Sequence, residues 1–295
     1  MNKFYDLVNL LRVHQWFKNI FILIPLIFSG RLLDTNLCLK NLNTFLAFCL
    51  LSGAAYIYND LHDLTSDKVH PEKSQRPLAS GLMSPLLASI GCALLLAAGL
   101  ILGWKVNIHV FFMGLVYITL NYTYNAFTKK RVLLDVMSIA LGFHVRIWAG
   151  SLAVGVTPSI WLQMCTFVLA LFLGFAKRRH ELFILDNKAM EHREVLSHYT
   201  LHFLDQMIMI CCTLAVVFYG LYTISINEIS HVGHQNILYS TVFVIYGIFR
   251  YLYLIHVQKM GGDPGYLLFN DKHLLTCVLL WAGCIFLAIY GHSIF

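Results

Sequence analysis

The apolar run LNTFLAFCLLSGAAYIY (Leu42–Tyr58) leads without a break into the polar stretch NDLHDLTSDKVHPEKSQRPLASG (Asn59–Gly81). Such an apolar run is typical of a membrane-spanning helix, which needs roughly 20 residues. Acidic side chains at the edge of a bilayer are costly, so their presence indicates a function. At helical spacing the oxygen-bearing side chains of the polar stretch recur every three or four residues, which predicts that they lie along one helix face. These side chains are Asn59, Asp60, Asp63 and Asp67.

The composition of the chain excludes a soluble globular protein. Of its 295 residues, 58% are hydrophobic and 12% are charged, and the mean hydropathy is +0.68. We therefore predict an all-α, polytopic membrane protein, folded as a single transmembrane domain over residues 1–295. Nine apolar stretches are long enough to form spans: Asn19–Leu33, Leu42–Tyr58, Leu86–Trp104, Val110–Tyr124, Leu133–Val154, Ile160–Phe175, Gln206–Ile226, Leu238–Ile255 and Leu274–Phe295.

The distribution of basic residues orients these spans. If the N-terminus is cytoplasmic and the spans alternate, nearly all of the 21 Lys and Arg residues fall on the cytoplasmic side, and only Arg31, Lys40 and Lys105 fall outside. The positive-inside rule therefore predicts a cytoplasmic N-terminus and an external C-terminus. The long polar connections, including the acidic cluster, then share the cytoplasmic face.

The first candidate site combines the acidic cluster with the basic residues that follow it. Hard oxygen ligands suit Mg²⁺, which usually binds one or two carboxylates, several waters and a substrate phosphate. Lys73 and Arg76 come directly afterwards and are expected to bind that phosphate. The alternative is that these acids are simply solvated at a helix end. The expected Mg²⁺ ligands are Asn59, Asp60, Asp63 and Asp67.

Two charged residues, Asp135 and Arg146, lie inside the span Leu133–Val154. They are eleven residues apart, on roughly one helix face. Because Arg146 would be very costly against lipid, we expect it to face the interior and to pair with an acid or bind an anion. A structural salt bridge without substrate is the alternative.

Polar residues at the ends of other spans are further candidates for binding phosphate groups. The run Lys177–Arg179 directly ends a span, and arginine suits bidentate phosphate contacts, although a positive-inside anchor would have the same sequence. A metal ion and many cations on one face favour a transferase that expels a diphosphate. The membrane would supply a lipidic partner. The remaining candidates are Gln15, Lys18, Asn19, Tyr124 and Lys129.

The pattern N-D-x-x-D-x-x-x-D at Asn59–Asp67 resembles the UbiA superfamily of intramembrane prenyltransferases, whose helices surround a central cavity. The decaprenyl-phosphate phosphoribosyltransferase branch is similar in several further stretches. Typical prenyltransferases carry a second motif, D-x-x-x-D, where this chain reads AKRRHELFILD, and the change from acid to base fits substrates with more phosphate. The further stretches are LRVHQWFKN, AKRRHEL at Ala176–Leu182, the spacing of Tyr124, Lys129, Asp135 and Arg146, and the late GGDP.

The resemblance implies Mg²⁺-dependent transfer of 5-phosphoribose from 5-phosphoribosyl 1-diphosphate to a decaprenyl-type polyprenyl phosphate. Diphosphate would be released at the cytoplasmic face of a bacterial inner membrane, in cell-envelope biosynthesis. Asp63, Asp67 and Asp135 are the expected catalytic residues, with Asp135 stabilising the positive charge that develops at ribose C1. The phosphate groups would be bound by Gln15, Lys18, Asn19, Lys73, Arg76, Tyr124, Lys129, Arg146, Lys177 and Arg178.

Two rival functions also fit the sequence. A UbiA-type prenyltransferase would move a polyprenyl chain from its diphosphate to an aromatic or other small acceptor, and it would need the same first acidic cluster. A lipid-phosphate carrier without chemistry would not need that cluster. No nucleic-acid partner is expected, and the oligomeric state, a homo-oligomer included, stays open.

Overall fold

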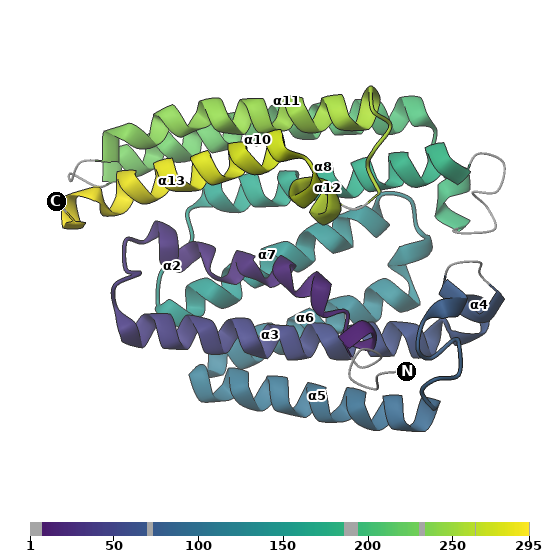
Figure 1. Cartoon of the computed structure of the whole chain (residues 1–295). Coiled ribbons are helices and arrows are strands. Elements are labelled where there is room, and N and C mark those ends of the chain that lie inside the picture. The colour runs from purple at the N-terminus through teal and green to yellow at the C-terminus, as the bar shows by residue number, and fades with distance from the viewer. Residues whose placement is uncertain (1–7, 70–72, 186–193, 230–233, 263, 295) are drawn as a thin grey trace. The chain divides into compact units, whose positions relative to one another are not determined.

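The computed structural model describes residues 8–69, 73–185, 194–229, 234–262 and 264–294, and within these ranges every regular element is a helix (Figure 1). The prediction of an all-α protein is therefore confirmed for the described part of the chain. The chain divides into two compact units. Unit 1 comprises residues 1–129 and 142–158, and unit 2 comprises residues 130–141 and 159–295. Helix α7 (Leu134–Val154) contributes residues to both units.

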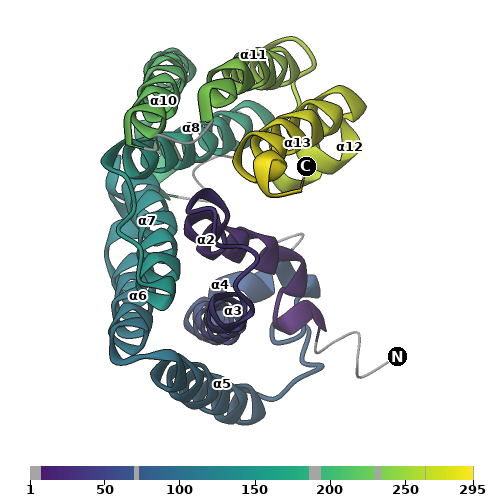
Figure 2. The ribbon, with the colours of Figure 1, turned by 90° about the vertical axis from the view of Figure 1, so that its left-hand side faces the viewer.

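Unit 1 is built around the long helix α3 (Thr35–His62), which packs against α5 and α6 and against the 3₁₀ helix η1 (Figure 2). Asp34 fixes the start of α3, because its carboxylate accepts hydrogen bonds from the amides of Asn36 and Leu37. Helix α5 begins with Ser84 as its N-cap and with Pro85 in the first turn. The other elements of this unit are η1 (Val13–Ile22), α2 (Ile24–Phe28), α4 (Leu64–Val69), η2 (Lys73–Gln75), α5 (Pro85–Val106), α6 (Ile108–Ala126) and most of η3 (Thr128–Lys130).

Unit 2 is held together by a core between α8 (Ile160–Leu185), α10 (Leu201–Ile229) and α11 (Thr241–His256). Phe172 of α8 and Tyr251 of α11 meet edge to face, with ring centroids 5.1 Å apart. Helix α13 packs against α11. The other elements are η5 (Glu194–His198), η6 (His234–Ser240), α12 (Pro264–Asn270) and α13 (Lys272–Ile294).

Seven of the described helices are long and apolar enough to cross a membrane, so the chain is a multi-pass membrane protein. Two of the nine expected spans differ from the rest. The stretch Asn19–Leu33 is a 3₁₀ segment followed by the short helix α2, with Pro25 in its first turn. The stretch Val110–Tyr124 falls in α6, whose last turns carry Asn121 and Asn125 and lower its hydropathy. The number nine therefore stays a prediction.

Gly150 lets α7 pass directly over the backbone of η1 in unit 1. A Cβ atom at Gly150 would lie 2.0 Å from the carbonyl oxygen of Ile22. We expect Gly150→Ala to destabilise the protein by about 1–3 kcal/mol, because backbone atoms must move to make room. The measurement is thermal unfolding of the purified protein in detergent.

Gly220 on α10 provides the matched control for Gly150. A Cβ atom there meets nothing within 4 Å. Gly220→Ala should leave stability unchanged or raise it by about 0.5–1 kcal/mol, because alanine has a higher helix propensity than glycine. Equal melting temperatures for the two alanine variants would contradict the close approach at Gly150.

Candidate active site

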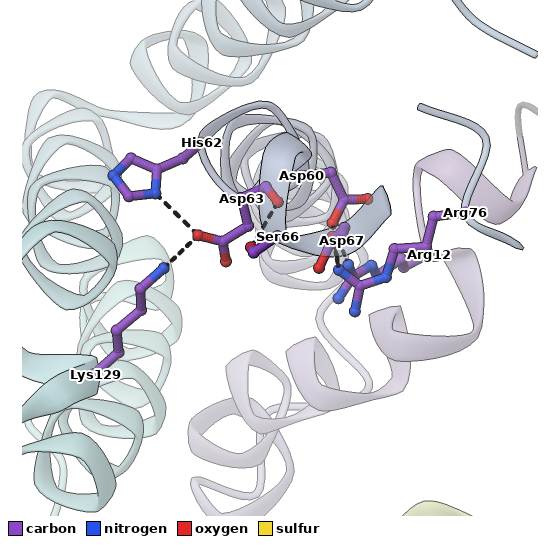
Figure 3. Close-up of polar contacts among 8 residues, drawn as sticks. All are labelled: Arg12, Asp60, His62, Asp63, Ser66, Asp67, Arg76 and Lys129. Atoms are coloured by element: carbon purple, nitrogen blue, oxygen red, sulfur yellow. Dashed lines mark hydrogen bonds and ion pairs between the residues drawn. The ribbon is translucent and has the colours of Figure 1, made fainter. Parts of the chain in front are cut away.

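The acidic cluster lies where α3 ends and α4 begins. Asp63 is the C-cap of α3, with φ −94° and ψ 9°, and α4 starts at the next residue. Figure 3 shows that Asp60 and Asp67 point to one side of the chain and that Asp63 points to another. The expectation that all the oxygen atoms line one helix face is therefore wrong. The break in the helix at Asp63 is the physical reason.

Asp60 and Asp67 share the guanidinium group of Arg76. Nη1 of Arg76 lies 3.1 Å from Oδ1 of Asp60 and 2.6 Å from Oδ2 of Asp67. Both aspartates are 3% exposed, which is rare for acids unless they are paired. Arg76 was expected to bind phosphate, and in this structure it neutralises two acids that were expected to bind metal.

Asp63 has separate cationic partners. Its Oδ1 accepts a hydrogen bond from Nζ of Lys129 at 2.6 Å and lies 3.0 Å from Nδ1 of His62 (Figure 3). Burial raises the pKa of the Asp63 carboxyl, but the hydrogen bonds from Lys129 and His62 outweigh it and hold the pKa below the ordinary value. Asp63 is therefore an anion at neutral pH.

Arg12 is a member of this cluster that the sequence did not identify. Its Nη2 hydrogen-bonds to Oδ1 of Asp60 across 48 positions of sequence, and its guanidinium lies over the ring of Tyr56, 5.0 Å from the centroid. Arg12 also has φ 48° and ψ 49°, a left-handed conformation that is uncommon for residues other than glycine. The only sequence signal was its place in the polar opening LRVHQWFKN.

The donor chemistry of the cluster fits Mg²⁺. In the described part of the chain, one carboxylate oxygen has no hydrogen-bond partner in each of Asp60, Asp63 and Asp67. The side-chain amide of Asn59 makes no hydrogen bond there either. However, no three His, Cys, Asp or Glu side chains among the described residues converge as a metal cage. The cluster therefore suits a site with one or two carboxylates that water and substrate phosphate complete.

Arg146 lies in a neutral polar network inside unit 1. Its Nε donates to Oδ1 of Asn19 at 2.7 Å, and its Nη2 donates to the hydroxyl of Tyr117 at 2.9 Å. Nη1 donates to the carbonyl of Gly142 at 2.8 Å. The hydroxyl of Ser52 lies 3.1 Å from that of Tyr117 and extends the network. The expectation that Arg146 pairs with an acid is wrong for the described residues, since its hydrogen-bond partners there are neutral.

Asp135 and Arg178 form a buried ion pair in unit 2. Nε of Arg178 lies 2.7 Å from Oδ2 of Asp135, and the two side chains are 2% and 0% exposed. Tyr199 donates to the other oxygen of Asp135 at 2.8 Å, and Glu181 accepts from Arg178 at 2.6 Å. Burial raises the pKa of the Tyr199 hydroxyl, so it stays a donor at neutral pH. These residues link α7, α8 and the segment before α10.

The other candidate residues are distributed over both units. Lys73 is in η2 beside Arg76, and Tyr124 is near the end of α6. Lys177 is exposed on α8, where it makes no ion pair with a described residue. Gln15 and Lys18, like Asn19, are carried by η1.

The late glycine pair of GGDP packs against α8. A Cβ atom at Gly262 would lie 3.0 Å from Nε2 of His180, and one at Gly261 would lie 3.1 Å from Cβ of His180. The glycines therefore allow this loop to approach the imidazole closely. Asp263 of the same motif lies outside the described residues.

The fold has close counterparts among solved structures. A UbiA homolog from Archaeoglobus fulgidus bound to GPP and Mg²⁺ matches with a TM-score of 0.71 at 18% identity, over 96% of this chain and 99% of that chain. The model of the UbiA prenyltransferase family matches residues 23–264. The chain belongs to the UbiA prenyltransferase family. The resemblance in the sequence motifs is thereby confirmed, and the protein is a membrane-embedded transferase of the UbiA family.

Two relatives of this UbiA-family chain share a more specific name. Decaprenyl-phosphate phosphoribosyltransferase from Mycolicibacterium smegmatis is 28% identical, over 96% of this chain and 92% of the relative. The protein of the same name from Corynebacterium glutamicum is 27% identical, over 96% of this chain and 86% of the relative. The similarity therefore extends through both units.

Proposed function

We propose that this UbiA-family protein transfers 5-phosphoribose from 5-phosphoribosyl 1-diphosphate to a polyprenyl phosphate and releases diphosphate. One observation carries the proposal: paired carboxylates and cations that suit a metal–diphosphate group lie together in a chain that aligns almost throughout with decaprenyl-phosphate phosphoribosyltransferases. We place the reaction at the cytoplasmic face of a bacterial inner membrane, because the positive-inside rule predicts that most of the basic residues lie on that face.

The acidic cluster holds the donor diphosphate through Mg²⁺ in this proposal. Asn59, Asp63 and Asp67 are the ligands, and Asp60 supports them by anchoring Arg76. Since Asp63 and Asp67 point to different sides of the chain in this structure, one of these side chains must turn before both can reach one ion. When bound, Mg²⁺ neutralises charge on the leaving diphosphate. Lys73 and Arg76 contact the diphosphate oxygens directly, and Lys129, next to Asp63, binds a further phosphate oxygen.

The acceptor needs no general base from the chain, because a phosphomonoester is already ionised at neutral pH. One of its oxygens forms a bond to C1 of the ribose as the bond from C1 to the diphosphate breaks, and the diphosphate leaves with the electron pair. Positive charge builds up at C1 and negative charge builds up on the departing diphosphate. The cations that hold the diphosphate stabilise that negative charge. We assign the 5-phosphate and the lipid phosphate to the remaining cationic and polar candidates, Gln15, Lys18, Asn19, Tyr124, Arg146, Lys177 and Arg178.

Several of these assignments need a change of partner, because Arg146 and Asn19 are already hydrogen-bonded to each other. Arg178 is already paired with Asp135 and Glu181, and Asp135 accepts from Tyr199. Lys177 is exposed and forms no ion pair with a described residue. Lys177 is thus the stronger of the two adjacent candidates for a phosphate contact, and Asp135 reaches a substrate only if it leaves Arg178.

The rival reaction is prenyl transfer from a polyprenyl diphosphate to a small acceptor, because that donor carries a diphosphate too. Purified protein offered both donors, each with its acceptor and Mg²⁺, should form a phosphoribosylated lipid and no prenylated aromatic acid. A prenylated product alone would contradict the proposal.

A further inference from the structure

Every acid of the candidate metal site already carries a basic partner from the same chain. Asp63 is paired with Lys129 at 2.6 Å. Asp67 is paired with Arg76 at 2.6 Å, and Asp60 is paired with Arg76 and Arg12 (Figure 3). These acids and bases balance in formal charge. These six side chains are therefore neutral together, and the carboxylates of Asp63 and Asp67 are bound to Lys129 and Arg76, two of the cations assigned to phosphate.

A metal ion that arrives alone at this site meets competition. It must displace Arg76 from Asp67 or Lys129 from Asp63. Breaking such a pair is costly, because a partly buried cation then loses a carboxylate partner. A diphosphate that arrives alone meets the same difficulty, because it must draw the same cations away from the acids. When both arrive, the metal takes the carboxylates, the phosphate takes the cations, and every charge stays paired.

We infer that Arg76 and Lys129 are resident counter-ions of the metal-binding carboxylates, and that the metal and the diphosphate therefore bind as a coupled pair. The inference rests on the metal role of Asp63 and Asp67 in the proposed function. It does not depend on which organic group the donor carries, because a phosphoribosyl and a prenyl donor present the same diphosphate.

Asp60 is bound by two arginines, so it can hold Arg76 in place while Arg76 exchanges Asp67 for the diphosphate. Oδ1 of Asp60 accepts from both Arg12 and Arg76, and the Asp60 side chain is 3% exposed. Arg76 can thus leave Asp67 and remain anchored on Asp60. The side chain of Arg76 is 27% exposed, so its guanidinium has access to a ligand from solvent.

Arg76→Gln tests the inference, because it removes the counter-ion of Asp67. The full chain in detergent is titrated with Mn²⁺ in the absence of diphosphate, and free Mn²⁺ is followed by electron paramagnetic resonance. We expect the variant to bind Mn²⁺ about 5-fold more tightly than the natural protein, a typical size for coupling between two ligands. Inorganic diphosphate, titrated separately in EDTA, should bind about 5-fold more weakly.

Lys68→Gln is the matched control, since Lys68 is an exposed cation one residue from Asp67 and has no ion pair with a described residue. It removes the same charge and should change neither affinity by more than about 2-fold, because exposed charges are screened. Lys129→Gln repeats the test at Asp63 and should also tighten Mn²⁺ binding. It serves as the second variant if Arg76→Gln fails to fold.

Unchanged or weaker Mn²⁺ binding in both counter-ion variants would overturn the inference. A different result would contradict the proposed function as well as the inference. If the natural protein binds no Mn²⁺ even with inorganic diphosphate present, the carboxylates are not a metal site, and the inference falls together with the metal role of Asp63 and Asp67.

Discussion

Asp63→Asn is expected to lower the rate of phosphoribosyl transfer at least ~100-fold, because positioning a metal on the leaving group is worth several kcal/mol. The change keeps the shape of the side chain and removes its negative charge. Lys129 then loses its ion-pair partner. The measurement is the initial rate of lipid product formation at saturating Mg²⁺, with folding checked by thermal unfolding.

Asp34→Asn is the matched control for this loss, since it makes the same substitution at the other end of α3. Asp34 is exposed and acts as the N-cap, and asparagine caps a helix as well as aspartate does. Its rate should stay within about 2-fold of the natural protein. A lipid-phosphate carrier without chemistry predicts instead that Asp63→Asn keeps full function, and that outcome would rule out both enzyme assignments.

Asp135→Asn is expected to destabilise the protein by about 3 kcal/mol, which breaking one partner of a buried ion pair typically costs. Arg178 would keep Glu181 and lose its most buried partner, so the low end of the usual range applies. The apparent melting temperature should fall by roughly 6–12 °C, from the usual relation between stability and melting temperature in chains of somewhat smaller size.

A double variant separates the structural role of this pair from a catalytic one. Asp135→Asn with Arg178→Met removes both charges, and replacing a whole buried pair by less polar groups is often neutral. We expect it to regain at least half of the lost melting temperature. If Asp135 instead acts at ribose C1, the single variant loses activity while its melting temperature stays unchanged.

Much of the architecture follows from hydropathy. The apolar runs that predict helices in the sequence coincide with long helices in the structure, because a backbone in lipid must satisfy its own hydrogen bonds. The stretch Asn19–Leu33 departs from this pattern. Hydropathy reports that this stretch is apolar, and it does not report that η1 winds as a 3₁₀ helix before Pro25.

The sequence predicted which acids lie near one another along the chain, and it did not predict their partners. Spacing identified Asp60, Asp63 and Asp67, but the break at Asp63 turns that residue away from the other two. Spacing along one helix also carries no information on partners far apart in sequence. Arg12, 48 positions before Asp60, is an example.

Arg146 and Asp135 illustrate the same limit inside the spans. The sequence indicated that Arg146 must face the interior, and both Arg146 and Asp135 are buried. It did not indicate that neutral groups such as Asn19 would satisfy Arg146, or that Arg178 would satisfy Asp135. Both choices depend on tertiary packing between segments that no local pattern encodes.

The most direct test of the proposed reaction uses a donor labelled with ¹⁴C in the ribose and ³²P in the 5-phosphate. Purified protein, polyprenyl phosphate and Mg²⁺ should yield a lipid that contains both labels in the ratio of the donor, with unlabelled diphosphate released. EDTA should abolish the product. Phosphoribosyl transfer would be contradicted if the lipid fraction contained neither label while the same protein prenylated an aromatic acid from polyprenyl diphosphate.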